Sequence, residues 1–277
     1  YQPSQAVAYN DLPELECWVL HRLAELDQLI RKACDVHEYN RVYTALMNFC
    51  GVELSAFYFD IRKDVLYCDA VNAPRRLAAQ TVLAEIFKCL TAWFAPIAVF
   101  TTEEVWHQRK ADEAEQGLTE TLAPEASIHE AQWPDLPSAW LQPDLATKWD
   151  HLRKIRRVIT GALEIPRQDK TIGSSLEAAP TVYLSAEHMA VAKDEAWDDI
   201  AIASKVTLSS DGAPEAAFTL DDVPGVAVVF EKATDARCER CWKHIPDVGA
   251  HPNHPNICVR CADAFETNAT MNGISGA

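Results

Sequence analysis

The sequence predicts a mainly α chain in which an antiparallel helical bundle, a small α/β unit and a short cysteine-rich module follow one another. Long runs with helical periodicity fill residues 1–110, and β-like runs separated by a helical stretch lie within 149–235. Residues 236–277 have too few apolar groups to fold around a hydrophobic core of their own. Long helices with short connections favour an antiparallel bundle, and residues 111–148 are predicted to be an acidic, proline-containing linker.

Helical periodicity predicts three long helices and a short one in the bundle. Apolar residues recur at helical spacing over 13–37, 39–60 and 74–94. The middle run is apolar on nearly all sides, so we expect this helix at the centre of the bundle. The spacing Thr101-x-x-Glu104 is that of a capping box and predicts a short fourth helix that ends at about residue 106.

The linker is expected to lie on the surface, held by the apolar side chains of Trp133 and Trp140. Helices and strands then alternate. The predicted elements are a helix at 146–164, a strand at 182–184, a helix at 186–197, and strands at 200–208 and 226–230. This alternation in so short a stretch is typical of a small α/β or α+β fold.

Composition and charge exclude several classes of protein. With 277 residues, of which 48% are hydrophobic and 24% charged, the chain is typical of soluble globular proteins rather than of disordered or fibrous ones. The longest weakly polar run, 89–102, contains Pro96 and is too short to span a bilayer, so no membrane partner is expected. A net charge of −16 argues against holding nucleic acid by bulk attraction and leaves only local basic patches for that role.

The first residue and the cysteines indicate the cellular compartment. The chain starts at Tyr1 without a signal segment, so we interpret it as cut from a longer cytoplasmic polypeptide. Scattered single cysteines in mostly apolar helical stretches are expected to be buried, reduced thiols: Cys17, Cys34, Cys50, Cys68 and Cys89. An odd total of nine cysteines favours a reducing compartment, where close pairs are metal ligands more often than disulfides.

The remaining four cysteines form the motif Cys238-x2-Cys241-x16-Cys258-x2-Cys261. Two Cys-x2-Cys turns at this separation supply four thiolates that close a tetrahedron around one zinc ion. Such an ion contributes on the order of 10 kcal/mol to folding, in place of the missing apolar core. Ligation by all four cysteines leaves no open position, so the predicted Zn²⁺ is structural and the module is a zinc finger. Three histidines between the pairs remain alternative ligands: His244, His251 and His254.

Cations and one aromatic residue surround the two cysteine turns: Arg237, Arg240, Trp242, Lys243 and Arg260. Trp242 directly follows a predicted zinc ligand, where so small a module can hardly bury an indole. Aromatic faces stack unpaired bases and guanidinium groups reach phosphates, so these residues are candidates for an RNA contact. The alternative is that Trp242 packs against the neighbouring α/β unit.

Several motifs carry a resemblance to a known family. The segments 237–242 (RCERCW) and 257–261 (ICVRC) resemble the C-terminal zinc module of bacterial isoleucyl-tRNA synthetases. The formamidopyrimidine-type DNA glycosylases end in a similar module. Elsewhere, 54–64 (LSAFYFDIRKD), 90–106 and 163–178 are similar to the helical anticodon-binding domain of the synthetase and to the segments that follow it.

The resemblance implies a class Ia anticodon-binding bundle, a junction unit and a zinc module that together hold the anticodon stem-loop of isoleucine tRNA. It also implies a monomer, with ATP-dependent attachment of isoleucine and editing of misacylated valine in N-terminal domains of the same polypeptide. The family's adenylation signatures and any Gly-rich phosphate loop are absent from this sequence. We therefore expect ATP to bind only in the parent enzyme, and no catalytic residue in this chain.

Two alternative functions remain open on the sequence alone. One is a free-standing, zinc-containing tRNA-binding module without a catalytic partner. The other is a zinc-finger repair protein similar to the DNA glycosylases, which the long helical bundle and the missing N-terminal Pro-Glu disfavour.

Overall fold

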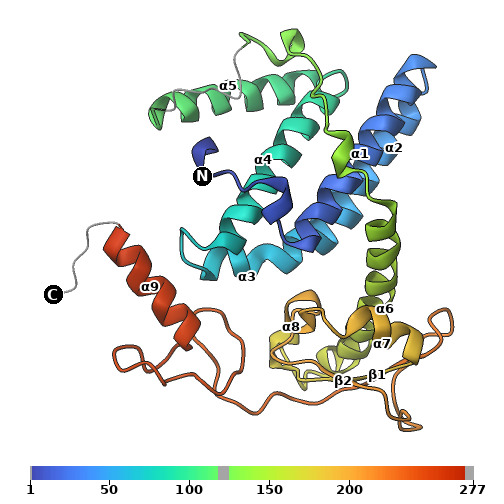
Figure 1. The fold of residues 1–277 in the computed structure, drawn as a ribbon, viewed down its shortest axis with the longest axis vertical. Coiled ribbons are helices and arrows are strands. Elements are labelled where there is room, and N and C mark those ends of the chain that lie inside the picture. The colour runs from blue at the N-terminus through green and yellow to red at the C-terminus, as the bar shows by residue number, and fades with distance from the viewer. Residues whose placement is uncertain (1, 118–124, 272–277) are drawn as a thin grey trace. The chain divides into compact units, whose positions relative to one another are not determined.

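The computed structural model describes residues 2–117 and 125–271, and the chain divides into two compact units. The first unit comprises residues 1–66 and 72–143, and the second comprises 67–71 and 144–277. Figure 1 shows helices in the first unit; the second contains helices, a small sheet and a long irregular stretch. The predicted mainly α fold class is confirmed. The division of the chain into four domains stays a prediction.

Helices build the described part of the first unit. They are α1 (Glu14–Asp35), α2 (Tyr39–Asn48), a π-helix (Phe49–Phe59), α3 (Asp60–Cys68), α4 (Pro74–Phe94) and α5 (Val99–Glu115). Helix α1 packs against both α2 and α4, and α4 packs against α5. Short 3-10 helices accompany them at Pro3–Gln5, Tyr9–Asp11, Ile128–Glu130 and Ser138–Trp140. The predicted helix at 74–94 has the same bounds in the structure, with Pro74 in its first turn.

The second predicted helix forms, but it is longer and wider than expected. After α2 the chain continues through the π-helix into α3, so the helical path reaches Cys68 instead of ending near residue 60. The π-helical residues Leu54, Phe57 and Tyr58 are buried. On the same helical path, however, Tyr43, Met47 and Val52 are 50%, 48% and 49% exposed, so the predicted position at the centre of the bundle is wrong. A run that is apolar on all sides gives no periodicity that would distinguish π from α turns.

The predicted capping box is wrong. Helix α5 begins at Val99, two residues before Thr101, and it runs to Glu115. The residue before the helix, Ala98, has no side chain that could cap it, and the Thr102 hydroxyl donates to the Ala98 carbonyl oxygen at 3.0 Å. The spacing of a capping box therefore lies inside the helix here, because an apolar turn precedes it.

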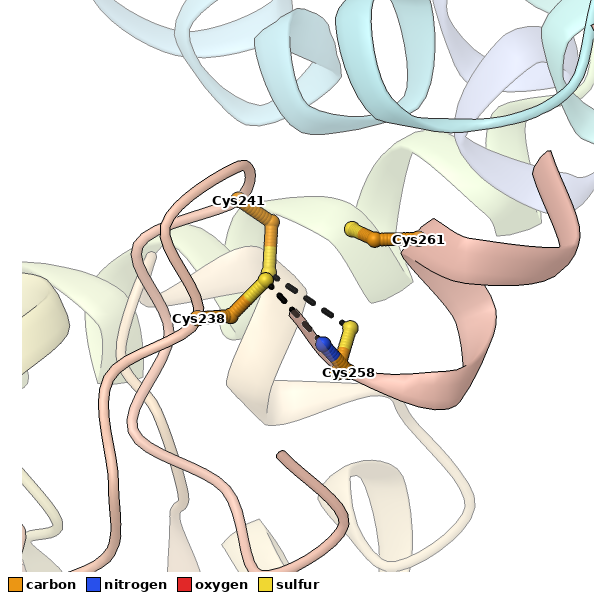
Figure 2. Close-up of side chains that lie close together, drawn as sticks. All are labelled: Cys238, Cys241, Cys258 and Cys261. Carbon is orange, nitrogen blue, oxygen red and sulfur yellow. Dashed lines mark hydrogen bonds between the residues drawn. The ribbon is translucent and has the colours of Figure 1, made fainter. Parts of the chain in front are cut away.

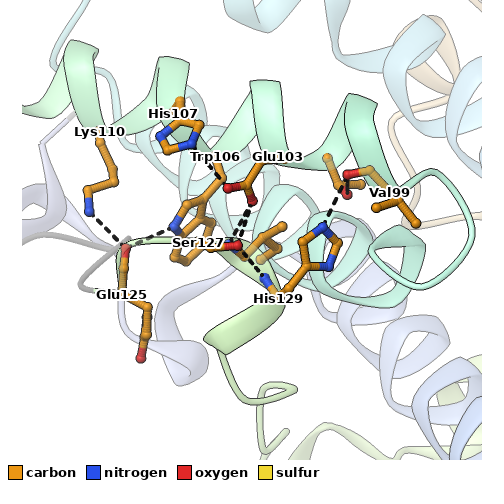
Figure 3. Close-up of polar contacts among 10 residues, drawn as sticks. Val99, Glu103, Trp106, His107, Lys110, Glu125, Ser127 and His129 are labelled. Carbon is orange, nitrogen blue, oxygen red and sulfur yellow. Dashed lines mark hydrogen bonds and ion pairs between the residues drawn. The ribbon is translucent and has the colours of Figure 1, made fainter.

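Polar contacts with α5 hold the segment that was predicted to be a linker (Figure 3). Glu103 accepts a hydrogen bond from the Ser127 hydroxyl at 2.8 Å, and this bond holds the pKa of Glu103 below its usual range. The Trp106 indole and the Lys110 ammonium both donate to the Glu125 carbonyl oxygen, at 3.1 and 2.8 Å. Residues 125–128 are thus fixed by hydrogen bonds that the irregular sequence did not reveal.

The two tryptophans expected to anchor this segment differ in their surroundings. Trp140 is buried, as predicted. Trp133 is half-buried, and the Arg31 guanidinium carbon lies 5.9 Å from the centroid of its ring, close enough for a cation–π contact.

One helix among the described residues, α4, is long and apolar enough to cross a membrane by length and composition. Of its apolar window, 44% is buried within the structure. The core helix of a soluble bundle passes the same test, so α4 carries no argument for a membrane span.

Helix α6 (Pro143–Gln168) and a three-stranded sheet form the scaffold of the second unit. The central strand β1 (Thr181–Leu184) is parallel to β2 (Thr207–Ser209) and antiparallel to β3 (Val226–Val229). Two short helices, α7 (Ala186–Ala192) and α8 (Trp197–Ile200), follow β1, a 3-10 helix lies at Ser175–Glu177, and α9 (Val259–Met271) closes the described chain.

The predicted strand at 200–208 is mostly wrong, because only its last two residues lie in β2. Ile202 has a φ of 54°, a left-handed conformation that an extended strand excludes. The Val206 N–H donates to an Asp198 carboxylate oxygen at 2.5 Å, and the Ser204 N–H donates to the Ala178 carbonyl oxygen at 3.1 Å. These hydrogen bonds take the place of the strand-to-strand hydrogen bonds that the apolar sequence led us to expect.

Candidate metal centre

The two Cys-x2-Cys turns bring four sulfurs into one buried group (Figure 2). In the first turn, the Trp242 N–H donates to the Cys238 carbonyl oxygen at 2.9 Å. In the second, Cys258 immediately precedes α9 and Cys261 lies in its first turn. The side chains of all four cysteines are buried, and their sulfurs lie within 4.8 Å of one another.

The spacing of these sulfurs fits one tetrahedral zinc ion. Zinc–sulfur bonds of about 2.3 Å place two sulfurs of a tetrahedron about 3.8 Å apart, and the sulfurs of Cys241 and Cys258 are 3.9 Å apart. The Cys258 N–H also points at the Cys238 sulfur from 3.3 Å. Burial raises the pKa of the Cys258 thiol to about 11 in the absence of an ion. A divalent cation would replace these protons and compensate the buried thiolates.

The three histidines that the sequence left open as ligands lie outside the four-sulfur group. A ring nitrogen of His244 lies 2.9 Å from the Asp235 carbonyl oxygen. His251 and His254 lie instead with Glu266, where a ring nitrogen of each is within 3.7 Å of one carboxylate oxygen. The geometry thus favours ligation by four cysteines, and this ligand assignment stays a proposal.

The cysteine module is fastened to the rest of the second unit by the cations predicted for RNA contact. Lys243 forms a largely buried ion pair with Asp199, at 2.7 Å, and Arg260 pairs with Asp69 at 3.1 Å. The guanidinium of Arg240 donates to two backbone carbonyl oxygens, those of Tyr67 at 3.0 Å and Cys68 at 2.5 Å. Three of the five predicted contact residues therefore also have a structural role.

The other two predicted contact residues face solvent. Trp242 is 61% exposed, and its φ of 66° is left-handed, which is uncommon for a residue other than glycine. Arg237 is also exposed. The packed alternative for Trp242 is not what the described structure shows, because most of the indole surface remains accessible.

Sequence reasoning predicted that Cys68 is a buried thiol but missed that it packs beside the four proposed ligands. Residues 67–71 belong to the second unit, and the buried Cys68 packs in the same cluster as the four predicted ligands. Its thiol lies 3.8 Å from the carbonyl oxygen of Arg240. A separation of 172 residues along the chain hides this contact from any local motif.

Comparison with known proteins matches two families. Residues 16–183 match the anticodon-binding domain of tRNA ligase, and residues 237–264 match the zinc finger found in FPG and IleRS. Since the first match covers more than half of the sequence, the chain belongs to the family of tRNA-ligase anticodon-binding domains. The second match, together with the buried four-cysteine group, establishes one structural zinc ion as its cofactor.

Individual relatives are similar over nearly the whole chain. Isoleucine–tRNA ligase of Brucella abortus biovar 1 is 47% identical over 266 residues, which are 96% of this chain and 26% of that protein. The enzymes of the same name from Agrobacterium fabrum and Ruegeria pomeroyi are 43% and 48% identical, over 96% and 92% of this chain and 26% and 25% of their own lengths. The chain thus spans about a quarter of the length of the curated relatives that it matches.

Proposed function

We propose that this chain is the tRNA-recognition part of an isoleucine–tRNA ligase, and that it binds the anticodon stem-loop of isoleucine tRNA. Amino-acid activation with ATP, the aminoacylation step and the editing of misacylated valine belong to other domains of the longer polypeptide. The whole enzyme acts in the cytoplasm as a monomer. The match of 16–183 to an anticodon-binding family supports this proposal over a zinc-finger repair protein, whose resemblance is confined to the zinc module.

The observation that carries the proposal is the exposed indole of Trp242. It directly follows Cys241, a proposed zinc ligand, and its left-handed backbone costs on the order of 1 kcal/mol, which the surrounding turn has to compensate. A large apolar ring that is 61% exposed on a turn held by a metal ion has no packing role that would explain its place. It is a preorganised platform on which an unpaired base can stack.

The positive charges near Trp242 differ in what they can offer to a phosphate. Lys243 and Arg260 are compensated by the carboxylates of Asp199 and Asp69. Arg240 donates to carbonyl oxygens, which orient the guanidinium without neutralising it, and it makes no ion pair within the described part of the chain. We therefore assign the phosphate contact to Arg240, helped by the exposed Arg237.

Trp242→Ala in the full-length enzyme should weaken the binding of isoleucine tRNA about ten- to a hundredfold, because stacking on an aromatic ring contributes roughly 1–3 kcal/mol per base. The measurement is equilibrium binding of the tRNA, with zinc content and amino-acid activation determined in parallel. Trp242→Phe should retain most of the affinity. Phe100→Ala, which removes another exposed aromatic ring (86% exposed), should leave the affinity for the tRNA unchanged. Unchanged tRNA affinity of Trp242→Ala would remove the indole from the contact.

Arg240→Gln should lower the slope of log affinity against log salt concentration by about one unit, because one phosphate contact is lost. Lys243→Gln is the matched comparison, since the ammonium that it removes is already paired with Asp199. This variant should leave the salt slope unchanged. Equal slopes for wild type and Arg240→Gln would contradict a phosphate contact at Arg240, even if the overall affinity fell.

A further inference from the structure

A second group of metal-ligating side chains lies in the zinc module, apart from the four cysteines. It consists of His251, His254 and Glu266, whose nitrogen and oxygen ligand atoms lie within 4.8 Å of one another. The Nε2 atoms of His251 and His254 are 3.7 and 3.4 Å from the same Glu266 carboxylate oxygen. The imidazole rings are stacked, with centroids 5.1 Å apart and planes inclined by 30°.

These distances fit one divalent ion. Zinc bonds of about 2.0 Å to nitrogen and oxygen separate two ligand atoms of a tetrahedron by about 3.3 Å. The observed 3.4 Å already meets this spacing, and 3.7 Å requires only a small side-chain adjustment. Two imidazoles and one carboxylate favour zinc and its transition-metal neighbours over magnesium or calcium, which prefer oxygen ligands alone.

The local sequence keeps the three side chains together. Both histidines lie in the segment between the cysteine pairs, where the His254 N–H donates to the His251 carbonyl oxygen at 3.2 Å and closes a turn. Glu266 lies on α9, the helix whose first turn contains Cys261. The rings of His254 and Phe265 also make an edge contact, with centroids 5.3 Å apart and planes inclined by 71°. The proposed ligands are thus prearranged by a turn and a helix that the structural zinc already joins.

We propose that His251, His254 and Glu266 bind a second zinc ion, more weakly than the four cysteines bind the first. The two histidine side chains are 16% and 22% exposed and the glutamate is 46% exposed, so water reaches the site and can complete the coordination. Three protein ligands with an open fourth position distinguish this site from the closed structural centre. The ion ties the segment between the cysteine pairs to α9.

One existing contact opposes this ion and has to open. The Asn253 N–H lies 3.3 Å from Nδ1 of His251 and uses that nitrogen as an acceptor. Zinc at Nε2 places the imidazole proton on Nδ1, where it becomes a donor. The contact is long and lies on the exposed surface, so water replaces it readily. Without an ion, the Nε2 atoms of His251 and His254 lie 3.7 and 3.4 Å from the Glu266 carboxylate oxygen.

Equilibrium dialysis of the tag-free chain, with its first zinc in place, against buffered micromolar Zn²⁺ tests the proposal. The chain should bind about two zinc ions, and both His254→Gln and Glu266→Gln should bind about one. His107→Gln is the matched control, because His107 also pairs with a carboxylate, that of Glu103 at 3.1 Å, but belongs to no close group of three ligands among the described residues. This variant should keep both ions.

Two results would overturn the proposal. In one, the wild-type chain binds a single zinc ion throughout the dialysis series. In the other, Glu266→Gln and His254→Gln still bind the second ion, which would place it elsewhere on the surface. Titration of reactive thiols verifies in each variant that the four-cysteine centre is still loaded. A substitution that damages the first centre is thereby told apart from one that removes only the second.

Discussion

Cys258→Ser is expected to release the structural zinc ion and to unfold residues 237–264, the part of the zinc module that matches the zinc-finger family. Cys258 contributes a sulfur to the group, and its backbone N–H points at the Cys238 sulfur. Apart from cysteines, the side chains that pack in this cluster are three partly buried ones: Ile245, Val248 and Ile257. So small an apolar core cannot replace the roughly 10 kcal/mol that a structural zinc ion supplies.

The measurements are zinc content and the rate of proteolysis within 237–264. Cys68→Ser is the matched control, because Cys68 packs in the same buried cluster but lies outside the four-sulfur group. It should keep the tightly bound zinc ion and a protected module. Helices of the first unit should remain folded in both variants, since that unit has its own core around Trp18, Tyr58 and Trp93. If Cys258→Ser still held the tightly bound zinc ion, as distinct from the weaker ion proposed at His251, His254 and Glu266, the ligand assignment would be wrong.

Helices that are amphipathic could be predicted well because one face of each is buried and the other is not. Helix α4 has the predicted bounds, and α1 differs from the prediction by one or two residues at each end. Where that contrast is missing, the sequence was less informative. The apolar π-helix Phe49–Phe59 has no polar face, and the apolar residues near 200–206 form turns whose N–H groups bond to a side chain and to a distant carbonyl.

The candidate site was predictable only as far as its ligands are local. Two Cys-x2-Cys turns encode the four-sulfur group, because each pair of ligands is separated by a single turn. The partners of Arg240 are not encoded in this way. These partners are the backbone carbonyls of residues 67 and 68, which lie 172 or more positions away along the chain. Every residue has a backbone carbonyl, so the amino-acid sequence does not mark these two as partners. Sequence patterns identify side-chain types at short spacings. The orientation of the Arg240 guanidinium depends instead on tertiary structure, which such patterns do not contain.

Arg62→Met is expected to destabilise the first unit by about 3–5 kcal/mol, because it leaves a buried carboxylate uncompensated. The Glu16 side chain is fully buried, and Arg62 binds both of its oxygens, at 2.6 and 2.5 Å. The Tyr58 hydroxyl donates a further hydrogen bond to it at 3.2 Å. Without the guanidinium, the neutral Tyr58 hydroxyl is the remaining hydrogen-bond partner of this charge among the described residues, and it compensates the charge far less than water would.

Urea unfolding followed by circular dichroism measures the loss as a lower midpoint of the transition of the first unit. Lys63→Met is the matched control on the same helix: its ion pair with Asp60 is exposed, and its removal should cost well under about 1 kcal/mol. The double variant Glu16→Gln/Arg62→Met should recover part of the stability, because the uncompensated charge is gone. If the double variant is no more stable than Arg62→Met alone, the cost arises from lost packing of the arginine side chain and not from the buried charge.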